Sequence, residues 1–167
     1  MSRVPFEALP DESRLWVFGV GRDLDESEEE AFLNKVDHFL DTWMAHGVEL
    51  RCGRDWRHGR FLLVAVDEAS EPPSGCSIDA MVRVLKEEEG VLGLPILDSS
   101  PVWFLKGDTV QRAARVEFKR LAEDGTVGPE TIVFDNTVTR LTEEREGRWE
   151  RAATDGWHGK LDELAIW

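Results

Sequence analysis

The chain has 167 residues, 41% of them hydrophobic, and carries 34 acidic against 20 basic side chains, for a formal net charge of −14. This charge repels phosphate backbones and anionic lipid headgroups, so neither nucleic acid nor a membrane is expected as a partner. The sequence lacks the roughly 20 consecutive apolar residues of a membrane helix, and residues Met1 to Pro5 lack the apolar run of a secretion signal.

The first part of the chain predicts a strand followed by a long helix. Residues 1–12 are interpreted as a mobile leader, and the apolar run from Arg14 to Val20 is typical of a buried strand. Asp25 and Ser27 then open a helix, because Ser27 and Glu30 have the spacing of a capping box.

Apolar residues recur in this helix at intervals of three and four, so they form one continuous stripe. The stripe predicts a helix that ends at His46-Gly47, with Trp43 in the core. Its members are Phe32, Leu33, Val36, Phe39, Leu40 and Trp43.

A hairpin and a second helix are predicted next. Val48 to Arg54 and Arg60 to Asp67 are interpreted as two strands, and the second helix runs from Ser77 to Glu89 and ends at Gly90. A strand near Val102 to Leu105 completes the order β-α-β-β-α-β, which is the arrangement of ferredoxin-like domains.

The last third of the chain is less regular. It predicts a turn at Lys106 to Asp108, a short helix from Val116 to Glu123 and a strand from Thr131 to Phe134. The fold class is therefore α+β, with a ferredoxin-like domain over residues 1–106 and a small appended α/β module over residues 107–167 packed on it. Three tryptophans are expected to pin the C-terminal segment: Trp149, Trp157 and Trp167.

The clearest candidates for catalytic residues lie at the start of the second helix. Cys76 follows a glycine turn there, and the N-terminus of a helix favours the thiolate form. A thiol-dependent hydrolase or transferase would use Cys76 as nucleophile, His46 or His158 as base and Asp79 as orienting group. The alternative is a buried, inert thiol, and on that preferred interpretation Cys76 reacts with alkylating agents more slowly than Cys52.

A second candidate site is a basic segment with a tryptophan. Arginine forks beside a stacking ring suit an anionic or nucleotide-like ligand. The alternative is a solvated hairpin tip whose arginines pair with carboxylates of the same molecule. The candidate ligand-binding residues are Arg54, Trp56, Arg57 and Arg60.

Other site classes find little support in the sequence. The cysteines and histidines lack the spacing of a structural zinc site, and neither a phosphate-binding loop nor a complete dinucleotide fingerprint is present, so we expect no metal and no cofactor. Two cysteines are too few for a disulfide framework, which predicts a cytoplasmic protein with free thiols.

Three blocks of the sequence carry a resemblance to a known family: Thr42 to Gly47, Ser74 to Asp79, and Thr131 to Asn136. With the pair Trp157-His158, they resemble an uncharacterised family of small bacterial proteins of similar length. Some members of that family are labelled "ABC transporter ATPase", although this chain has no Walker motif. The resemblance directs attention to the polar residues of these blocks. It does not indicate a function.

Two functions remain open. The preferred one is a non-catalytic binding or interaction module for a protein or a small anionic ligand, which it recognises through a sheet edge or the arginine segment. The other is the thiol-dependent enzyme.

Overall fold

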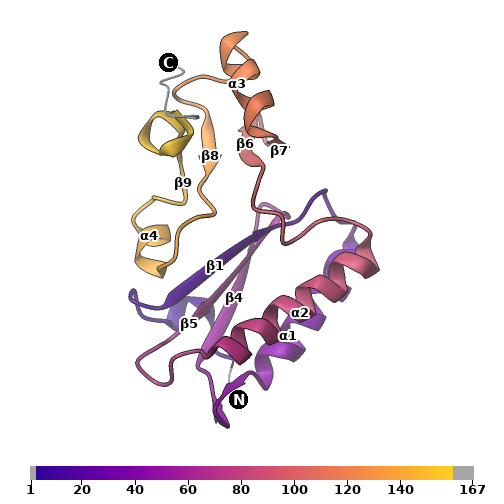
Figure 1. Cartoon of the computed structure of the whole chain (residues 1–167), viewed down its shortest axis with the longest axis vertical. Coiled ribbons are helices and arrows are strands. Elements are labelled where there is room, and N and C mark those ends of the chain that lie inside the picture. Colours follow the sequence, from indigo (N-terminus) through magenta and orange to yellow (C-terminus); the bar gives the residue numbers. More distant parts are fainter. Residues whose placement is uncertain (1–2, 160–167) are drawn as a thin grey trace. The chain divides into compact units, whose positions relative to one another are not determined.

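The computed structural model describes residues 3–159, and the chain divides into two compact units. The first unit comprises Met1–Leu97 and Thr139–Thr142, and the second comprises Asp98–Val138 and Glu143–Trp167. Both contain helices and antiparallel strands, so the α+β class is confirmed (Figure 1).

The first unit is built on a three-stranded sheet in the order β1-β5-β4, with β5 antiparallel to both neighbours. β1 and β4 therefore run parallel to each other with β5 between them, and α1 lies between β1 and β4 in the chain. The elements are η1 (Phe6–Ala8), β1 (Arg14–Gly19), α1 (Glu26–Asp41), β2 (Met44–Ala45), β3 (Val48–Glu49), β4 (Cys52–Arg57), β5 (Phe61–Val66) and α2 (Gly75–Leu92).

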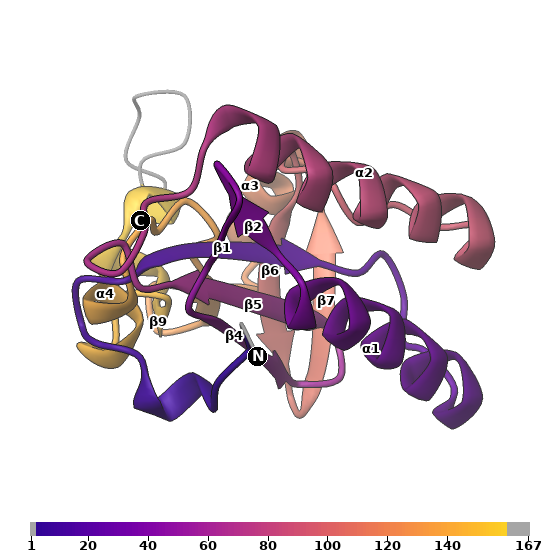
Figure 2. The same cartoon turned by 90° about the horizontal axis from the view of Figure 1, so that it is seen from below.

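Both long helices pack against one face of this sheet. Alternate residues of a strand point to the same face, and Leu62, Val64 and Val66 of β5 share a core with residues of α1 and α2. Figure 2 shows the two helices beside each other, with the β2–β3 hairpin near one end of them. The predicted stripe of α1 is confirmed, because its buried residues are Phe32, Val36 and Leu40.

The first helix starts and ends earlier than the sequence predicts. Asp25 is the N-cap and forms a capping box with Glu28, rather than Ser27 with Glu30. The helix ends at Asp41, and His46 and Gly47 instead form the turn between β2 and β3 with φ angles of 52° and 77°. Positive φ at both central residues suits the twist of a two-residue hairpin, which explains why the chain turns there.

The second helix is longer than predicted. Ser74 and Ser77 form a capping box at its start, and Gly90 lies inside the helix. The helix ends at Leu92, where Gly93 has a φ of 66° and takes the left-handed conformation of a C-terminal glycine.

The ferredoxin-like arrangement is not confirmed. The strand expected to complete the first sheet is β6 (Val102–Lys106), which pairs with β7 and β8 in the sheet of the second unit. The second unit accordingly begins at Asp98, whereas the predicted boundary lies after Lys106. An apolar run predicts burial in a strand but does not identify the partner strand.

The second unit has a four-stranded antiparallel sheet in the order β7-β6-β8-β9. The predicted turn before Thr109, the short helix and the strand near Val133 are confirmed, whereas β7 and β9 were not predicted. Its other elements are β7 (Thr109–Ala113), α3 (Arg115–Glu123), β8 (Ile132–Phe134), α4 (Leu141–Arg145), which begins in the first unit, β9 (Glu150–Ala152) and η2 (Ala153–Asp155).

The tryptophans of the C-terminal segment help to close this unit. Trp149 is buried, packs on Phe134 with ring centroids 5.2 Å apart, and donates through Nε1 to Asn136 at 2.9 Å. Trp157 donates to Asp135 at 3.0 Å. These contacts all lie within the second unit, so pinning of the segment against the rest of the protein stays a prediction, and Trp167 lies outside the described residues.

Residues Thr139–Thr142 belong to the first unit, although they follow most of the second unit in the sequence. Thr139 accepts a backbone hydrogen bond from Leu15, and Arg140 forms an isolated antiparallel bridge with Arg14 at the outer edge of β1. Among the helices within residues 3–159, none is both long and apolar enough to cross a membrane.

Trp43 joins α1, the hairpin and α2, which makes it the best test of this core. It is 2% exposed, and its indole Nε1 donates to the carbonyl oxygen of Ser77 at 2.8 Å. Trp43→Ala should lower the free energy of unfolding by about 3–5 kcal/mol. Trp43→Phe keeps a ring but removes the donor, while the Ser77 carbonyl keeps its helical partner in α2, so it should cost less, about 0.5–1.5 kcal/mol for the lost hydrogen bond.

Urea unfolding measures both changes. Val91→Ala serves as the control, because Val91 is on α2 but 77% exposed. An unchanged urea midpoint for Trp43→Ala would contradict the placement of this side chain in the core.

Candidate functional site

A concave site of about 380 Å³ lies in the first unit where the N-terminal segment crosses β4. We call it the arginine groove. Two guanidinium groups, an apolar wall and one carboxylate line it, and its residues are Arg3, Val4, Pro5, Phe6, Glu7 and Arg54.

The N-terminal segment is held in place by backbone contacts with β4. The N–H of Val4 donates to the carbonyl oxygen of Cys52 at 2.7 Å, and Arg3 forms an isolated parallel bridge with the same residue. Gly53 makes this approach possible, because a Cβ added there would lie 2.6 Å from the Val4 carbonyl oxygen.

The interpretation of residues 1–12 as a mobile leader is therefore wrong for the part that the structure describes. Phe6 and Leu9 are buried, at 5% and 2% exposure. A short apolar sequence has no periodicity that reveals such packing, so it resembles an unstructured segment.

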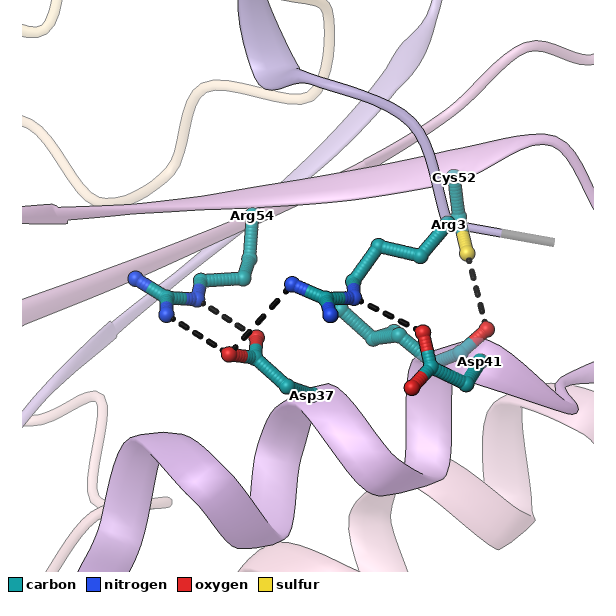
Figure 3. Close-up of polar contacts among 6 residues, drawn as sticks. Arg3, Asp37, Asp41, Cys52 and Arg54 are labelled. Atoms are coloured by element: carbon teal, nitrogen blue, oxygen red, sulfur yellow. Dashed lines mark hydrogen bonds and ion pairs between the residues drawn. The ribbon is translucent and has the colours of Figure 1, made fainter. Parts of the chain in front are cut away.

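Figure 3 shows how two arginines meet two aspartates of α1. Arg54 binds Asp37 in a bidentate manner, with Nε and Nη2 at 2.7 and 2.8 Å from the two carboxylate oxygens. Arg3 donates through Nε to Asp41 at 2.8 Å, and its Nη1 lies 3.4 Å from Asp37. Asp37 and Asp41 are four residues apart on α1 and therefore project on the same side of the helix.

Arg3, Arg54, Asp37 and Asp41 have no net charge as a group, since two guanidinium groups face two carboxylates. Burial alone would raise the pKa of Asp37, but the hydrogen bond from Arg54 and the charges of Arg54 and Arg3 lower it below its usual range. The hydrogen bond from Arg3 to Asp41 raises the pKa of Arg3 in turn. Toward the described residues, Nη1 of Arg54 and Nη2 of Arg3 make no hydrogen bond, so these donors remain available.

Of the four residues predicted to bind a ligand, only Arg54 lines the groove. Trp56 packs on Phe32 with ring centroids 5.6 Å apart. Arg57 pairs with Asp55, and the buried Arg60 donates to the carbonyl oxygen of Val20 at 2.9 Å.

The predicted basic turn is thus largely strand β4, and its arginines pair with carboxylates of the same chain. Arg3, Asp37 and Asp41 were missed. Two aspartates with four-residue spacing on the polar side of α1 were the only available signal.

The candidate thiol lies elsewhere in the first unit. Cys76 and Asp79 are exposed in the first turn of α2, and His46 is exposed in the turn between β2 and β3. The bond from Trp43 to Ser77 holds the hairpin against α2, which brings two of the sequence blocks together. Among residues 3–159, however, no hydrogen bond joins Cys76 to a histidine.

His158, the other predicted base, belongs to the second unit and is buried, at 0% exposure. Burial lowers the pKa of its imidazole to about 4. In this unit the indole of Trp157 donates to Asp135, which brings the third block and the Trp-His pair together.

The second cysteine is the less accessible one. Cys52 is buried, and its Sγ lies 3.5 Å from the carbonyl oxygen of Leu40. Burial is the main cause that raises the pKa of its thiol to about 12. The preferred expectation that Cys76 is the more protected cysteine is therefore wrong, because the start of a helix projects its second residue into solvent here.

The described part of the chain contains no group of three or more His, Cys, Asp and Glu residues that could hold a metal ion. Comparisons with protein-family models, with curated proteins and with solved structures found no match. The resemblance of the three blocks to a bacterial family therefore stays a prediction.

The two cysteines should differ strongly in reactivity. With iodoacetamide at pH 7.5, Cys76 should be alkylated in the native protein, whereas Cys52 should react only after unfolding, because its sulfur is buried and its pKa lies far above that pH. Mass spectrometry of peptides from native and urea-treated protein measures both rates. Cys76→Ser isolates Cys52, and rapid native modification of that variant would contradict the burial of Cys52.

Proposed function

We propose that the protein is a non-catalytic binding protein that holds a small ligand with one anionic and one apolar part in the arginine groove. The observation that carries this proposal is the pairing, in one concavity of about 380 Å³, of two guanidinium groups with the apolar side chains of Val4, Pro5 and Phe6. Arginine suits such a ligand because its planar fork can bind one anion while other donors keep their internal partners.

The charges of the groove limit the ligand. Asp37 and Asp41 already neutralise the two arginines, and Glu7 adds a carboxylate to the lining. A polyanion such as a nucleotide would be repelled, whereas a single carboxylate or phosphate monoester can use the remaining donors. Contact with the apolar wall must then supply much of the affinity.

The scaffold supports a binding role. The parallel pair β1 and β4, separated by β5, is the split β-α-β part of the ferredoxin-like arrangement, and it fixes Arg54 opposite α1. The groove contains no nucleophile or histidine among the residues that line it. The two free cysteines agree with a cytoplasmic location.

The thiol enzyme is the second candidate, and the exposure of Cys76 at the start of α2 is the one observation that favours it. It lacks a base, because no described histidine is hydrogen-bonded to the sulfur and a thiol nucleophile needs such a partner.

Binding can be tested by thermal shift with 3-phenylpropionate and hexyl phosphate, each compared with a neutral analogue of the same shape. The melting temperature should rise by about 3–6 °C at ten times Kd, and the rise should shrink with added salt. The neutral amide and alcohol keep the contact with the apolar wall but lack the charge that the two arginines recognise, so they should raise the melting temperature less, and that smaller rise should not depend on salt.

Arg54→Gln alone would leave Asp37 with only the 3.4 Å contact to Nη1 of Arg3, so the decisive variant is Arg54→Gln with Asp37→Asn, which removes both charges. It should abolish the shift. Arg120→Gln is the matched control, because Arg120 is an exposed arginine paired with Glu117. A wild type that ignores both probes, or a double variant that keeps the shift, would refute the proposal.

A further inference from the structure

One carboxylate of the arginine groove is not used by the protein itself. Glu7 is exposed, and its side chain makes no hydrogen bond or ion pair with any other residue of the range 3–159. The two aspartates behind the groove differ, because Asp37 and Asp41 are both paired with arginines. The charge of Glu7 is therefore left for solvent or for a ligand.

The fold holds Glu7 at the groove. It lies in η1, where Phe6 before it and Leu9 after it are buried. A Cβ added to Gly53 would lie 3.3 Å from the backbone of Phe6, so this segment rests directly on β4. Glu7 and Arg54 each follow one residue after that contact, and both line the concavity of about 380 Å³. An acidic and a basic side chain from distant parts of the sequence thus border one small space.

The groove and the carboxylates behind it carry an excess of negative charge. Two guanidinium groups stand against three carboxylates when Glu7 is counted with Asp37 and Asp41. A purely anionic ligand adds to this excess in a chain with a net charge of −14, whereas a ligand that also carries a cation does not. A cationic group beside Glu7 would balance the one charge that the arginines leave over.

We propose that the ligand of the arginine groove is an amino acid with an apolar side chain, an inference that rests on the proposed function. Its carboxylate accepts from the free donors of Arg54 and Arg3, and its ammonium donates to Glu7. Its side chain lies on the apolar wall that Val4 and Pro5 contribute. The volume of about 380 Å³ is near the lower end of the range of about 300–1,000 Å³ for ligand pockets, which suits a molecule of this size.

The test compares L-phenylalanine with 3-phenylpropionate, which has the same ring and carboxylate but no ammonium. In titrations of the whole chain at pH 7, followed by NMR, the Kd of L-phenylalanine should be about two- to fivefold lower, the gain typical of one accessible ion pair. 2-Phenylethylamine has the ammonium but no carboxylate. It should bind more weakly than either, because it leaves the free arginine donors without an acceptor.

Glu7→Gln is the decisive variant, because it removes the charge and keeps the size of an exposed side chain, so it is expected to fold. It should raise the Kd of L-phenylalanine to that of 3-phenylpropionate without weakening the binding of 3-phenylpropionate. Glu30→Gln is the matched control: Glu30 is an exposed glutamate of α1 outside the groove, and its loss changes the net charge equally. This control should keep the preference for L-phenylalanine.

The outcomes separate this inference from the proposed function. If 3-phenylpropionate binds but L-phenylalanine binds no tighter, or if Glu7→Gln keeps the preference, the amino acid is overturned as ligand while the proposed function stands. Binding of 2-phenylethylamine as tight as that of L-phenylalanine would overturn the inference too, since the acidic surface would then attract any amine. If neither carboxylate compound binds, both proposals are wrong.

Discussion

The central strand of the first unit is apolar along its whole length and has to be buried on both faces. All six residues of β5, Phe61–Val66, are buried, and the strand pairs with β1 on one edge and β4 on the other. Removing such a strand from water is the strongest driving force available to a unit of this size. The positions of both neighbouring strands and of the helices above them depend on it.

The arginine groove follows from this arrangement. Because β4 pairs with β5 and α1 packs over the sheet, Arg54 is placed opposite Asp37. The glycine next to Cys52 lets the N-terminal segment approach β4 closely, and that approach places Arg3 beside the same carboxylate. The groove is thus a consequence of core packing, and its residues are distant from one another in the sequence.

Local patterns predicted the elements better than their connections. The stripe of α1 was predicted because helical periodicity is a property of a single segment, and the burial of β5 because six apolar residues have no exposed alternative. The sheet to which β6 belongs was not predicted, since strand pairing depends on residues far along the chain. The early end of α1 was missed because the apolar spacing continues to Trp43, whereas the helix ends at Asp41 and His46 lies in a hairpin turn with a positive φ.

Long-range pairing also decides the candidate sites, and the sequence predicts these even less well than the strand order. Sequence identifies arginines, cysteines and histidines, but it does not say which carboxylate neutralises an arginine or which cysteine is buried. Arg60 is satisfied by Val20 and Asp23, about forty positions away, and this could not be anticipated from the neighbouring residues.

The two outer strands of the first sheet each carry a short cover from a remote part of the chain. At β4 it is the pairing of Arg3 and Val4 with Cys52, and at β1 it is the bridge between Arg14 and Arg140. An exposed sheet edge is a template on which other chains can add strands and aggregate. Covering each edge near one end, in a protein with a net charge of −14, leaves a shorter and more repulsive template for self-association. The N-terminal segment that lines the arginine groove therefore also shortens the edge of β4 to which another copy of the chain could add a strand.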